Sequence, residues 1–287
     1  MTITAERLAG SFVAEVRGVD VGNMSNQERT DLHRAYLDHK VLVIPDQDID
    51  VPQFSAFAGL FGEKAVHPVK NFLHPDFPEV MVLSNSTKFG KPVGVKDAGS
   101  FWHSDRSYTE RSADATMLYS LEIPDEGGDT YFADLEAAYD ALPEKMKQRI
   151  DGLTYVSQYR WTTNRDDPES RWSMLTPEER AKTPPVERPV VRTHPETGRK
   201  GLFIFPGISA GIRGIVGMES VECAELLDEL FDHMTQDRFQ YRFHWQGPRT
   251  IVLWDNRCVM HKATTKNLPA DKTRTLYRVS TLGEVPH

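Results

Sequence analysis

The stretch FQYRFHW, residues 239–245, alternates aromatic side chains with polar ones at every step. Successive side chains of a β-strand point to opposite faces, so this alternation predicts a half-buried strand over 239–245. Apolar runs at 41–44, 250–254 and 274–281 predict further strands. Many strands with only a few helices favour a mainly β fold, either a sandwich or a barrel with helical additions.

Three longer helices are expected in addition to these strands. Ser25 and Glu28 have the spacing of a capping box, which predicts a helix over 26–39. Pro52 opens a second amphipathic segment, and an apolar stripe over 223–234 marks the third helix. The sequence contains no internal repeat and no linker-like stretch, so a single domain is expected over residues 1–287.

The composition narrows the classes of function. With 39% hydrophobic and 26% charged residues, the 287-residue chain resembles soluble globular proteins. No apolar run is long enough to span a membrane and the first ten residues show no export signal, so we expect a cytoplasmic protein without a membrane partner. A net charge of −8 argues against a general nucleic-acid binder. Two cysteines are too few for a disulfide framework.

Residues 162–188 form a charged stretch that is rich in proline. A loop of this length within a compact domain is usually either functional or disordered. We therefore expect a lid or insert at 162–188 that covers the functional site.

The stretch SFWHSD, residues 100–105, carries the first candidate for chemistry. If it is a strand, His103 and Asp105 project from one face. An imidazole and a carboxylate are two of the three ligands of the facial triad that binds ferrous iron and leaves positions open for substrate and oxygen. His261, which follows the strand at 250–254, is the candidate third ligand. Taken alone, His-x-Asp is more often a hydrogen-bonded polar pair, and such a histidine an ordinary core or surface residue.

Two arginines follow on the last expected strand. Arg274 and Arg278 are four residues apart, so they face the same side of the strand with about 13 Å between them. Two guanidinium groups inside a barrel would be costly to bury without anions. The alternative is that this side of the strand faces solvent.

The candidate motifs occur in a specific order along the chain. They are WHSD at 102–105, GGDT at 127–130 and WDNR at 254–257, with His261, Arg274 and Arg278 after them. In this order and at these spacings, the set resembles the taurine dioxygenase / 2,4-dichlorophenoxyacetate dioxygenase (TauD/TfdA) family of Fe(II)- and 2-oxoglutarate-dependent dioxygenases. The segments AAYDALP at 137–143 and VRTHP at 191–195 also look like family segments. The similarity runs from residue 41 to residue 281.

The resemblance implies a double-stranded β-helix, or jelly roll, with flanking helices. It implies an oxidoreductase that hydroxylates a small anionic organic substrate, a sulfonate or carboxylate that is taurine-like or aryloxyalkanoate-like. The reaction would consume O2 and would be coupled to decarboxylation of 2-oxoglutarate to succinate and CO2. Family resemblance also suggests a homo-oligomer, either a dimer or a tetramer.

The resemblance also implies roles for individual residues. His103, Asp105 and His261 would bind Fe(II). The 2-oxoglutarate would chelate this metal, and its distal carboxylate would pair with Arg274 and accept a hydrogen bond from Thr130. An arginine suits this task because its planar guanidinium matches a carboxylate in a bidentate way. Two further residues would orient the ligand loop, namely Trp254 and Asn256.

The substrate pocket is assigned in part by the same resemblance. Arg278 would bind the acidic group of the primary substrate, and His67 stands where taurine dioxygenases carry a sulfonate-binding histidine. Phe203 and the region 159–161 are expected, from their order in the chain, to form the remaining wall. Gly99 replaces an asparagine that contacts substrate in the taurine enzymes, so the skeleton of the substrate stays open.

Three other functions fit part of the sequence. A zinc-dependent hydrolase on a cupin-like barrel would use the same three ligands with a bound water, but it gives Thr130, Arg274 and Arg278 no common role. A non-enzymatic binder of small anions would keep the barrel without the chemistry, although every expected metal and co-substrate position is filled. A biosynthetic oxygenase acting on an amino acid or a carrier-bound intermediate would use the same site, with room for a larger substrate at Gly99.

Overall fold

The computed structural model describes most of the chain. The described residues are 3–67, 71–88, 91–95, 99–159, 176–181, 183–206, 211–266, 268–269 and 271–287. Within them, no helix is both long enough and apolar enough to cross a lipid bilayer.

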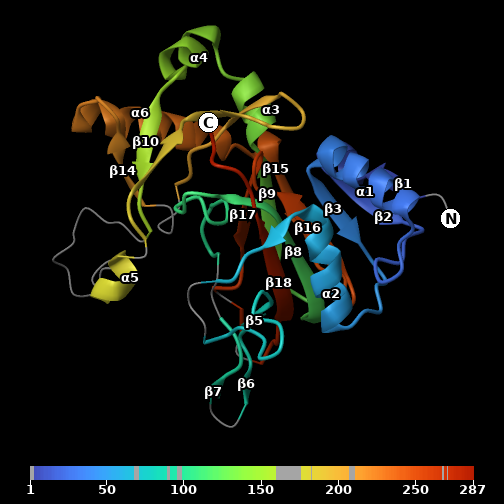
Figure 1. Ribbon diagram of the computed structural model, residues 1–287. Coiled ribbons are helices and arrows are strands. Elements are labelled where there is room, and N and C mark those ends of the chain that lie inside the picture. The colour runs from blue at the N-terminus through green and yellow to red at the C-terminus, as the bar shows by residue number, and fades with distance from the viewer. Residues whose placement is uncertain are drawn as a thin grey trace.

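An eight-stranded sheet forms the centre of the molecule (Figure 1). Its order is β1-β2-β3-β16-β8-β18-β4, and β5 pairs with β18 beside this path. Neighbouring strands are antiparallel except β2 and β3, which are parallel. The strands are β1 (Thr4–Arg7), β2 (Val13–Arg17), β3 (Val41–Ile44), β4 (Glu63–Lys64), β5 (Met81–Ser84), β8 (Ala113–Glu122), β16 (Ile251–Asp255) and β18 (Thr275–Leu282). Strands from both ends of the chain therefore share one sheet, while the single-domain division itself stays a prediction.

Smaller sheets complete the β structure. The one that matters for the site has the order β15-β9-β17, built from β9 (Thr130–Asp134), β15 (Gln240–Phe243) and β17 (Val259–Ala263). Another has the order β11-β10-β14, with β10 (Thr154–Ser157), β11 (Val186–Pro189) and β14 (Ile212–Ile215). Two hairpins pair β12 (Val191–Thr193) with β13 (Lys200–Leu202), and β6 (Thr87–Lys88) with β7 (Lys91–Pro92).

The helices begin where the sequence provides caps. The Ser25 hydroxyl accepts the Glu28 backbone N–H, and the Glu28 carboxylate accepts the Ser25 N–H at 2.8 Å, so the predicted capping box starts α1. Asp50 and Gln53 form the same arrangement at the start of α2. The helices are α1 (Asn26–His39), α2 (Val51–Ala58), α3 (Leu135–Asp140), α4 (Glu144–Ile150), α5 (Pro177–Ala181) and α6 (Ser220–Met234), with 3-10 turns at Leu8–Gly10, Gly59–Phe61 and Asp237–Phe239.

The two faces of the large sheet are buried against different partners. Leu42 and Ile44 of β3 pack in one core cluster with the apolar faces of α1 and α2. Val41 and Val43 point the other way and share a second cluster with Phe132 of β9, in the smaller β15-β9-β17 sheet. β3 is thus apolar at every position because both of its faces are buried. Two sheets packed face to face, with helices outside, make the fold the predicted jelly roll, mainly β with flanking helices.

A third core cluster lies at one end of the sheets. There α3 and α6 pack on each other and on the segment around β13, and this helical end occupies the top of Figure 1. The third predicted helix, at 223–234, is confirmed as the main part of α6.

The prediction of a strand over 100–105 is wrong. His103 makes only an isolated bridge with His261, and the residues around it form bends and turns. Gly99 at the start of this segment has a φ of 73°, and Arg106 at its end a φ of 55°, both far from the extended values of a strand. His103 and Asp105 converge because this loop bridges β17 at His261, and not because alternate side chains share a face.

Two other expectations need adjustment. The strand predicted over 239–245 is shorter, because β15 covers Gln240–Phe243 and the residues before it form a 3-10 turn at Asp237–Phe239. The lid predicted at 162–188 falls largely on 162–175 and 182, which lie outside the described residues, so it stays a prediction. The described part of that stretch contains α5 and the start of β11.

Candidate active site

Two histidines meet across a short backbone bridge. The His103 N–H donates to the His261 carbonyl at 3.0 Å, and the His261 N–H donates to the His103 carbonyl at 2.8 Å. His261 lies on β17, whereas His103 lies on the loop that precedes β8. The two imidazole rings come within 4.2 Å, measured between centroids. Residues 158 positions apart in the sequence are therefore held as neighbours by the main chain.

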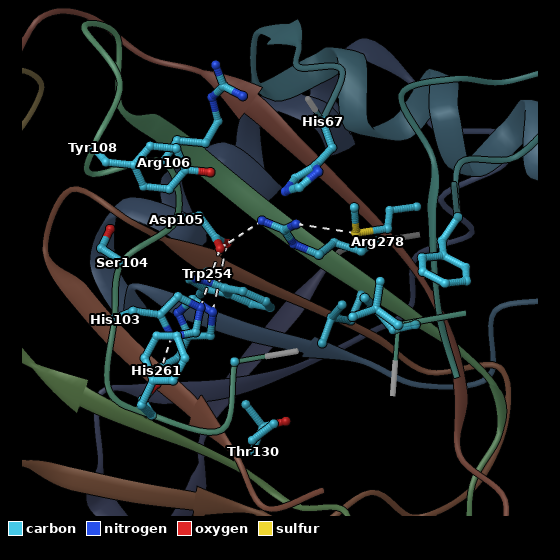
Figure 2. Close-up of a pocket in the computed structure, with 18 of the residues that line it drawn as sticks. His67, His103, Ser104, Asp105, Arg106, Tyr108, Thr130, Trp254, His261 and Arg278 are labelled. Carbon is cyan, nitrogen blue, oxygen red and sulfur yellow. Dashed lines mark hydrogen bonds and ion pairs between the residues drawn. The ribbon is translucent and has the colours of Figure 1, made fainter. Parts of the chain in front are cut away.

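Asp105 completes a group of three possible metal ligands. One of its carboxylate oxygens lies 3.7 Å from His103 Nε2 and the other lies 3.8 Å from His261 Nε2 (Figure 2). The ligating atoms of the three residues all lie within 4.8 Å of one another. Two imidazoles and one carboxylate on one side of a site are the donors of the facial triad, which leaves the opposite side free for other ligands.

Both imidazoles are neutral, and a neutral imidazole is the form that binds a metal. His103 Nδ1 lies 2.8 Å from the Phe101 carbonyl, and a carbonyl can only accept, so Nδ1 carries the proton and the Nε2 lone pair is free. Burial lowers the pKa of His103. Burial, and then the neighbouring His103, lower the pKa of His261 well below its usual value. Both rings are neutral at physiological pH.

The carboxylate of Asp105 is ionised. Burial alone would raise its pKa, but the charge of Arg278 above all, together with the Thr116 hydrogen bond, outweighs burial and lowers the pKa well below the usual range. Arg278 Nη2 lies 2.7 Å from one carboxylate oxygen, and the Thr116 hydroxyl donates to the other at 2.7 Å. The donor set is therefore two neutral nitrogens and one anionic oxygen, which fits a divalent transition metal ion.

Asn256 fixes the position of the aspartate. Its side-chain oxygen accepts the Asp105 backbone N–H at 3.1 Å and the Trp254 indole N–H at 3.1 Å. Its amide nitrogen donates to the Thr116 hydroxyl at 2.9 Å. The Trp254 ring in turn packs on the His261 ring, 4.5 Å between centroids. The two residues expected to orient the ligand loop make these contacts directly.

Arg274 presents an unsatisfied cation at the other side of the site. Its side chain is buried, and Nε and Nη2 have no hydrogen-bond partner within the described part of the chain. Burial lowers the pKa of Arg274 to about 10, although the charge of Asp129 acts in the opposite direction, so the guanidinium is still protonated at neutral pH. A buried, charged donor without a partner is costly unless an anion joins it. The arrangement fits a ligand carboxylate.

Gly128 and Trp245 shape the space around Arg274. A Cβ on Gly128 would lie 2.8 Å from Arg274 Cδ, so the glycine of the GGDT motif makes room for the arginine stem. The Trp245 ring lies 5.6 Å from the guanidinium carbon. Its indole N–H donates to the Thr130 hydroxyl oxygen at 3.2 Å, which leaves the Thr130 proton free to donate to a ligand. The sequence did not point to Trp245, whose alternation with its neighbours indicated only a buried face.

A cavity of about 370 Å³ joins the three possible metal ligands to the two arginines. Figure 2 shows Thr130 on one side of the triad and His67 and Arg106 on the other, with Arg278 between. An apolar wall completes the cavity. Its residues are Phe72, Met81, Leu83, Val95, Phe101 and Leu118. The cavity has the size and the mixed polarity of a site for small organic ligands.

Most of the predicted site residues lie at this cavity. They are His67, His103, Asp105, Thr130, Trp254, His261, Arg274 and Arg278. Tyr159 lines it too, as expected for the region 159–161, whose other two residues lie outside those described. The sequence analysis did not identify Arg106 and Tyr108 as residues of the cavity. Both closely follow Asp105, and this position in the motif is the only signal in the sequence that indicates them.

Phe203 is not at the cavity, which corrects its assignment to the pocket wall. It is fully buried in the core cluster of α3 and α6, and the Arg192 guanidinium carbon lies 5.0 Å from its ring. The Phe203 N–H donates to the Val190 carbonyl at 2.7 Å, which holds this residue at the helical end of the molecule. Chain order alone cannot show which end of a jelly roll a residue faces.

A second group of possible ligands is an ion-paired network. His194, Asp255 and Cys258 bring three ligating atoms within 4.8 Å. However, Arg257 binds both Asp255 oxygens at 2.8 Å, and His194 Nε2 binds one of them at 2.9 Å. Burial also raises the pKa of the Cys258 thiol well above its usual value, so the thiol stays protonated. This group is therefore structural.

The chain is similar to known proteins over nearly its whole length. Residues 4–280 match the family model described as "Taurine catabolism dioxygenase TauD, TfdA family". An alpha-ketoglutarate-dependent 2,4-dichlorophenoxyacetate dioxygenase of Burkholderia sp. (strain RASC) is 36% identical over 298 residues, covering 99% of this chain and 95% of that protein. A (S)-phenoxypropionate/alpha-ketoglutarate-dioxygenase of Sphingobium herbicidovorans is 34% identical, covering 90% of this chain and 88% of that protein.

Solved structures show the same similarity. The crystal structure of AAD-2 in complex with Mn(II) and N-oxalylglycine superposes with a TM-score of 0.79 at 30% identity, covering all of this chain and 99% of that one. A putative alpha-ketoglutarate-dependent taurine dioxygenase from Burkholderia xenovorans superposes with a TM-score of 0.81 at 28% identity, covering 99% of this chain and 94% of that one.

Proposed function

Because the chain belongs to the taurine catabolism dioxygenase TauD, TfdA family and is a 2-oxoglutarate-dependent dioxygenase, we propose that His103, Asp105 and His261 bind Fe(II). The observation that carries this proposal is the convergence of two neutral Nε2 atoms and one ionised carboxylate within 4.8 Å. The His103 Nδ1–H bond to Phe101 and the Asn256 bond to Asp105 hold the ligands in place before any metal arrives.

Arg274 and Thr130 are proposed to bind the distal carboxylate of 2-oxoglutarate. The support is the buried Arg274 guanidinium with unpartnered Nε and Nη2, together with the Thr130 hydroxyl proton that Trp245 leaves free. When bound, iron and 2-oxoglutarate supply the oxidising power for hydroxylating a C–H bond, with O2 consumed and 2-oxoglutarate converted to succinate and CO2. The carboxylate clamp fixes the orientation of the co-substrate, and burial strengthens it by excluding water.

The primary substrate is proposed to be a small organic anion, either a sulfonate or a carboxylate. Arg278 contacts Asp105 at 2.7 Å, so an anion bound to its remaining N–H groups would be held next to the metal ligands. His67 lines the same region, and the apolar wall suits the organic body of the substrate. The names of related proteins include dioxygenases for 2,4-dichlorophenoxyacetate, sulfonates and sulfate esters.

Turnover with a substrate panel tests this function. We expect O2-dependent formation of succinate from 2-oxoglutarate that at least one aryloxyalkanoate or alkanesulfonate stimulates, with Fe(II) required and Zn(II) inactive. Arg278→Gln should abolish the stimulation while leaving the slow substrate-independent decarboxylation. If no anion stimulates succinate formation and the zinc form hydrolyses esters, the hydrolase alternative replaces this proposal.

We also propose a homo-oligomer, a dimer or a tetramer, on the resemblance alone. Sedimentation velocity at micromolar concentration measures this directly, and a single monomeric species would contradict it.

A further inference from the structure

Arg106 is a cation at the lining of the cavity. The proposed reaction assigns it no role. It follows the metal ligand Asp105 directly, and its side chain lines the cavity beside Tyr108. Figure 2 shows it with His67 on the side of Arg278 that is remote from Thr130, where the 2-oxoglutarate carboxylate is expected. Its φ of 55° is one that side-chain-bearing residues rarely adopt, and such backbone outliers occur often at functional sites.

The guanidinium of Arg106 has no partner in the described part of the chain. Its Nε is buried and makes no hydrogen bond there, while the residue as a whole is half-buried. Burial lowers its pKa, and the positive charge of Arg278 lowers it further. By contrast, Arg111 on the same loop binds Glu63 at 2.8 Å and the Gly283 carbonyl at 2.7 Å. Arg106 is thus a cation at the cavity lining with a buried donor, Nε, that has no partner, and its guanidinium lies well apart from that of Arg278 in Figure 2.

The charge of the cavity gives the second argument. Its described lining residues include three arginines, at 106, 274 and 278, against one acid, Asp105. A divalent metal ion and the two carboxylates of 2-oxoglutarate cancel each other, so they leave this excess of two positive charges unchanged. A substrate with one anionic group would neutralise only one of the two. Arg274 is buried and Arg106 and Arg278 are half-buried, so water screens the repulsion between their charges only in part, and a second anion is favoured.

We propose that Arg106 binds a second anionic group of the primary substrate, which makes the preferred substrate a dianion. This rests on the proposed function, in which Arg278 binds the first anionic group. The substrate class is an organic acid with two separated carboxylate or sulfonate groups. Its body would lie between the two guanidinium groups, against the Tyr108 and Tyr159 rings, which pack 4.3 Å apart.

Binding measurements with matched ligands test this without turnover. The protein is loaded with Mn(II) and N-oxalylglycine, an inert analogue of 2-oxoglutarate, and titrated by calorimetry. The ligand pairs are phenoxyacetate with its 3- and 4-carboxy derivatives, and propane-1-sulfonate with 3-sulfopropanoate. We expect at least one dianion to bind about tenfold or more tightly than its monoanionic partner, because a hydrogen bond to a charged group contributes that much.

Variants then assign the preference to a residue. Arg106→Gln should weaken binding of the dianion only, so that the affinities for the dianion and the monoanion become similar. Arg106→Lys should retain part of the preference for the dianion. Arg278→Gln should weaken both ligands. Arg111→Gln is the matched control, since this arginine lies on the same loop but outside the cavity lining, and it should change neither affinity.

Failure of this inference differs from failure of the proposed function. If the loaded protein binds the monoanions but prefers no dianion of the panel, or if Arg106→Gln keeps the preference, Arg106 has no role in substrate binding. Pairing of Arg106 with another segment of the chain would give that result. If Fe(II) and 2-oxoglutarate themselves do not bind, the proposed function is wrong as well.

Discussion

Gly99 shows how a single position constrains the proposed metal site. A Cβ there would lie 2.8 Å from Cε1 of His103, and the φ of 73° already disfavours any side chain. The Gly99 carbonyl accepts the Ala263 N–H at 2.7 Å, which fixes the loop beside the strand that carries His261. Where the resemblance places a substrate-contacting asparagine in taurine enzymes, this chain has instead a close approach of backbone to His103, a proposed metal ligand.

We predict that Gly99→Ala weakens Fe(II) or Mn(II) binding, because the added methyl group displaces the His103 ring. Gly152→Ala is the matched control, since Gly152 has a φ of 69° but nothing within 4 Å of its added Cβ. Both variants pay the cost of a left-handed residue, about 1 kcal/mol of folding free energy. Only the first should lose metal affinity in an anaerobic titration, and equal metal affinity in the two variants would contradict this role of Gly99.

At the scale of elements, Arg274 and Arg278 occupy different positions relative to β18. Arg274 immediately precedes the strand and Arg278 lies within it, and a register shift between Thr275 and Leu276 falls between them. The expectation that both face one cavity holds, and the alternative of a solvent-facing strand does not, because Arg274 is buried and Arg278 reaches Asp105.

We predict that Arg274→Gln raises the concentration of 2-oxoglutarate needed for half-maximal turnover by at least about tenfold, because a charge-assisted bidentate pair is lost. The requirement for primary substrate should change little. Arg278→Gln should raise the concentration of primary substrate needed for half-maximal turnover and change the requirement for 2-oxoglutarate little. Steady-state kinetics with each substrate varied in turn measure both effects, and equal effects of both variants on both substrates would show that the arginines are misassigned.

The Asp255 network connects β16 to the segment that follows β12. Burial alone would raise the pKa of Asp255, but Arg257 and His194 lower it well below the usual value. Because the folded pKa is lower than the unfolded one, the network stabilises the fold at every pH above the unfolded pKa of about 3.9. That stabilisation is lost as the pH falls through the folded pKa.

We predict that Asp255→Asn lowers the free energy of unfolding at pH 7 by about 3 kcal/mol, because it removes the carboxylate that binds two nitrogens of the buried Arg257 guanidinium. The variant should also lose less stability than the natural sequence between pH 5 and pH 3. Urea unfolding at several pH values measures both. Asp48→Asn, which removes an exposed partner of Arg249, should leave both quantities nearly unchanged, and a similar loss in both variants would refute the network's role.

At the scale of the whole molecule, the jelly roll places the site between its two sheets. The cluster that contains Trp254, Phe132 and Trp245 joins β16 of the large sheet to β9 and β15 of the smaller one. His261, a proposed metal ligand, and Arg274 both lie against aromatic rings of this shared core. Residues that contact one another here come from segments more than a hundred positions apart, such as Trp245 and Thr130, which differ by 115 positions.

This distance in sequence explains what the sequence could and could not predict. The order of the motifs along the chain predicted the triad, Thr130 and the two arginines as site residues. Local capping patterns predicted where the helices begin. The prediction of a strand over 100–105 was wrong. An alternation of side chains over only six residues cannot exclude a loop whose backbone turns at a glycine. Phe203 was misplaced, and Arg106 and Trp245 were missed, because side-chain direction at a cavity depends on contacts that no local pattern contains.

The most direct test of the proposed site is an anaerobic titration of the metal-free protein with Fe(II) and 2-oxoglutarate, followed by visible absorption. Chelation of the co-substrate by the iron produces a weak metal-to-ligand charge-transfer band. We expect this band in the natural sequence, its loss in His261→Ala, and a much higher 2-oxoglutarate requirement for it in Arg274→Gln. Absence of the band in the natural sequence, with tight binding of zinc at the same three residues, would contradict the proposed function.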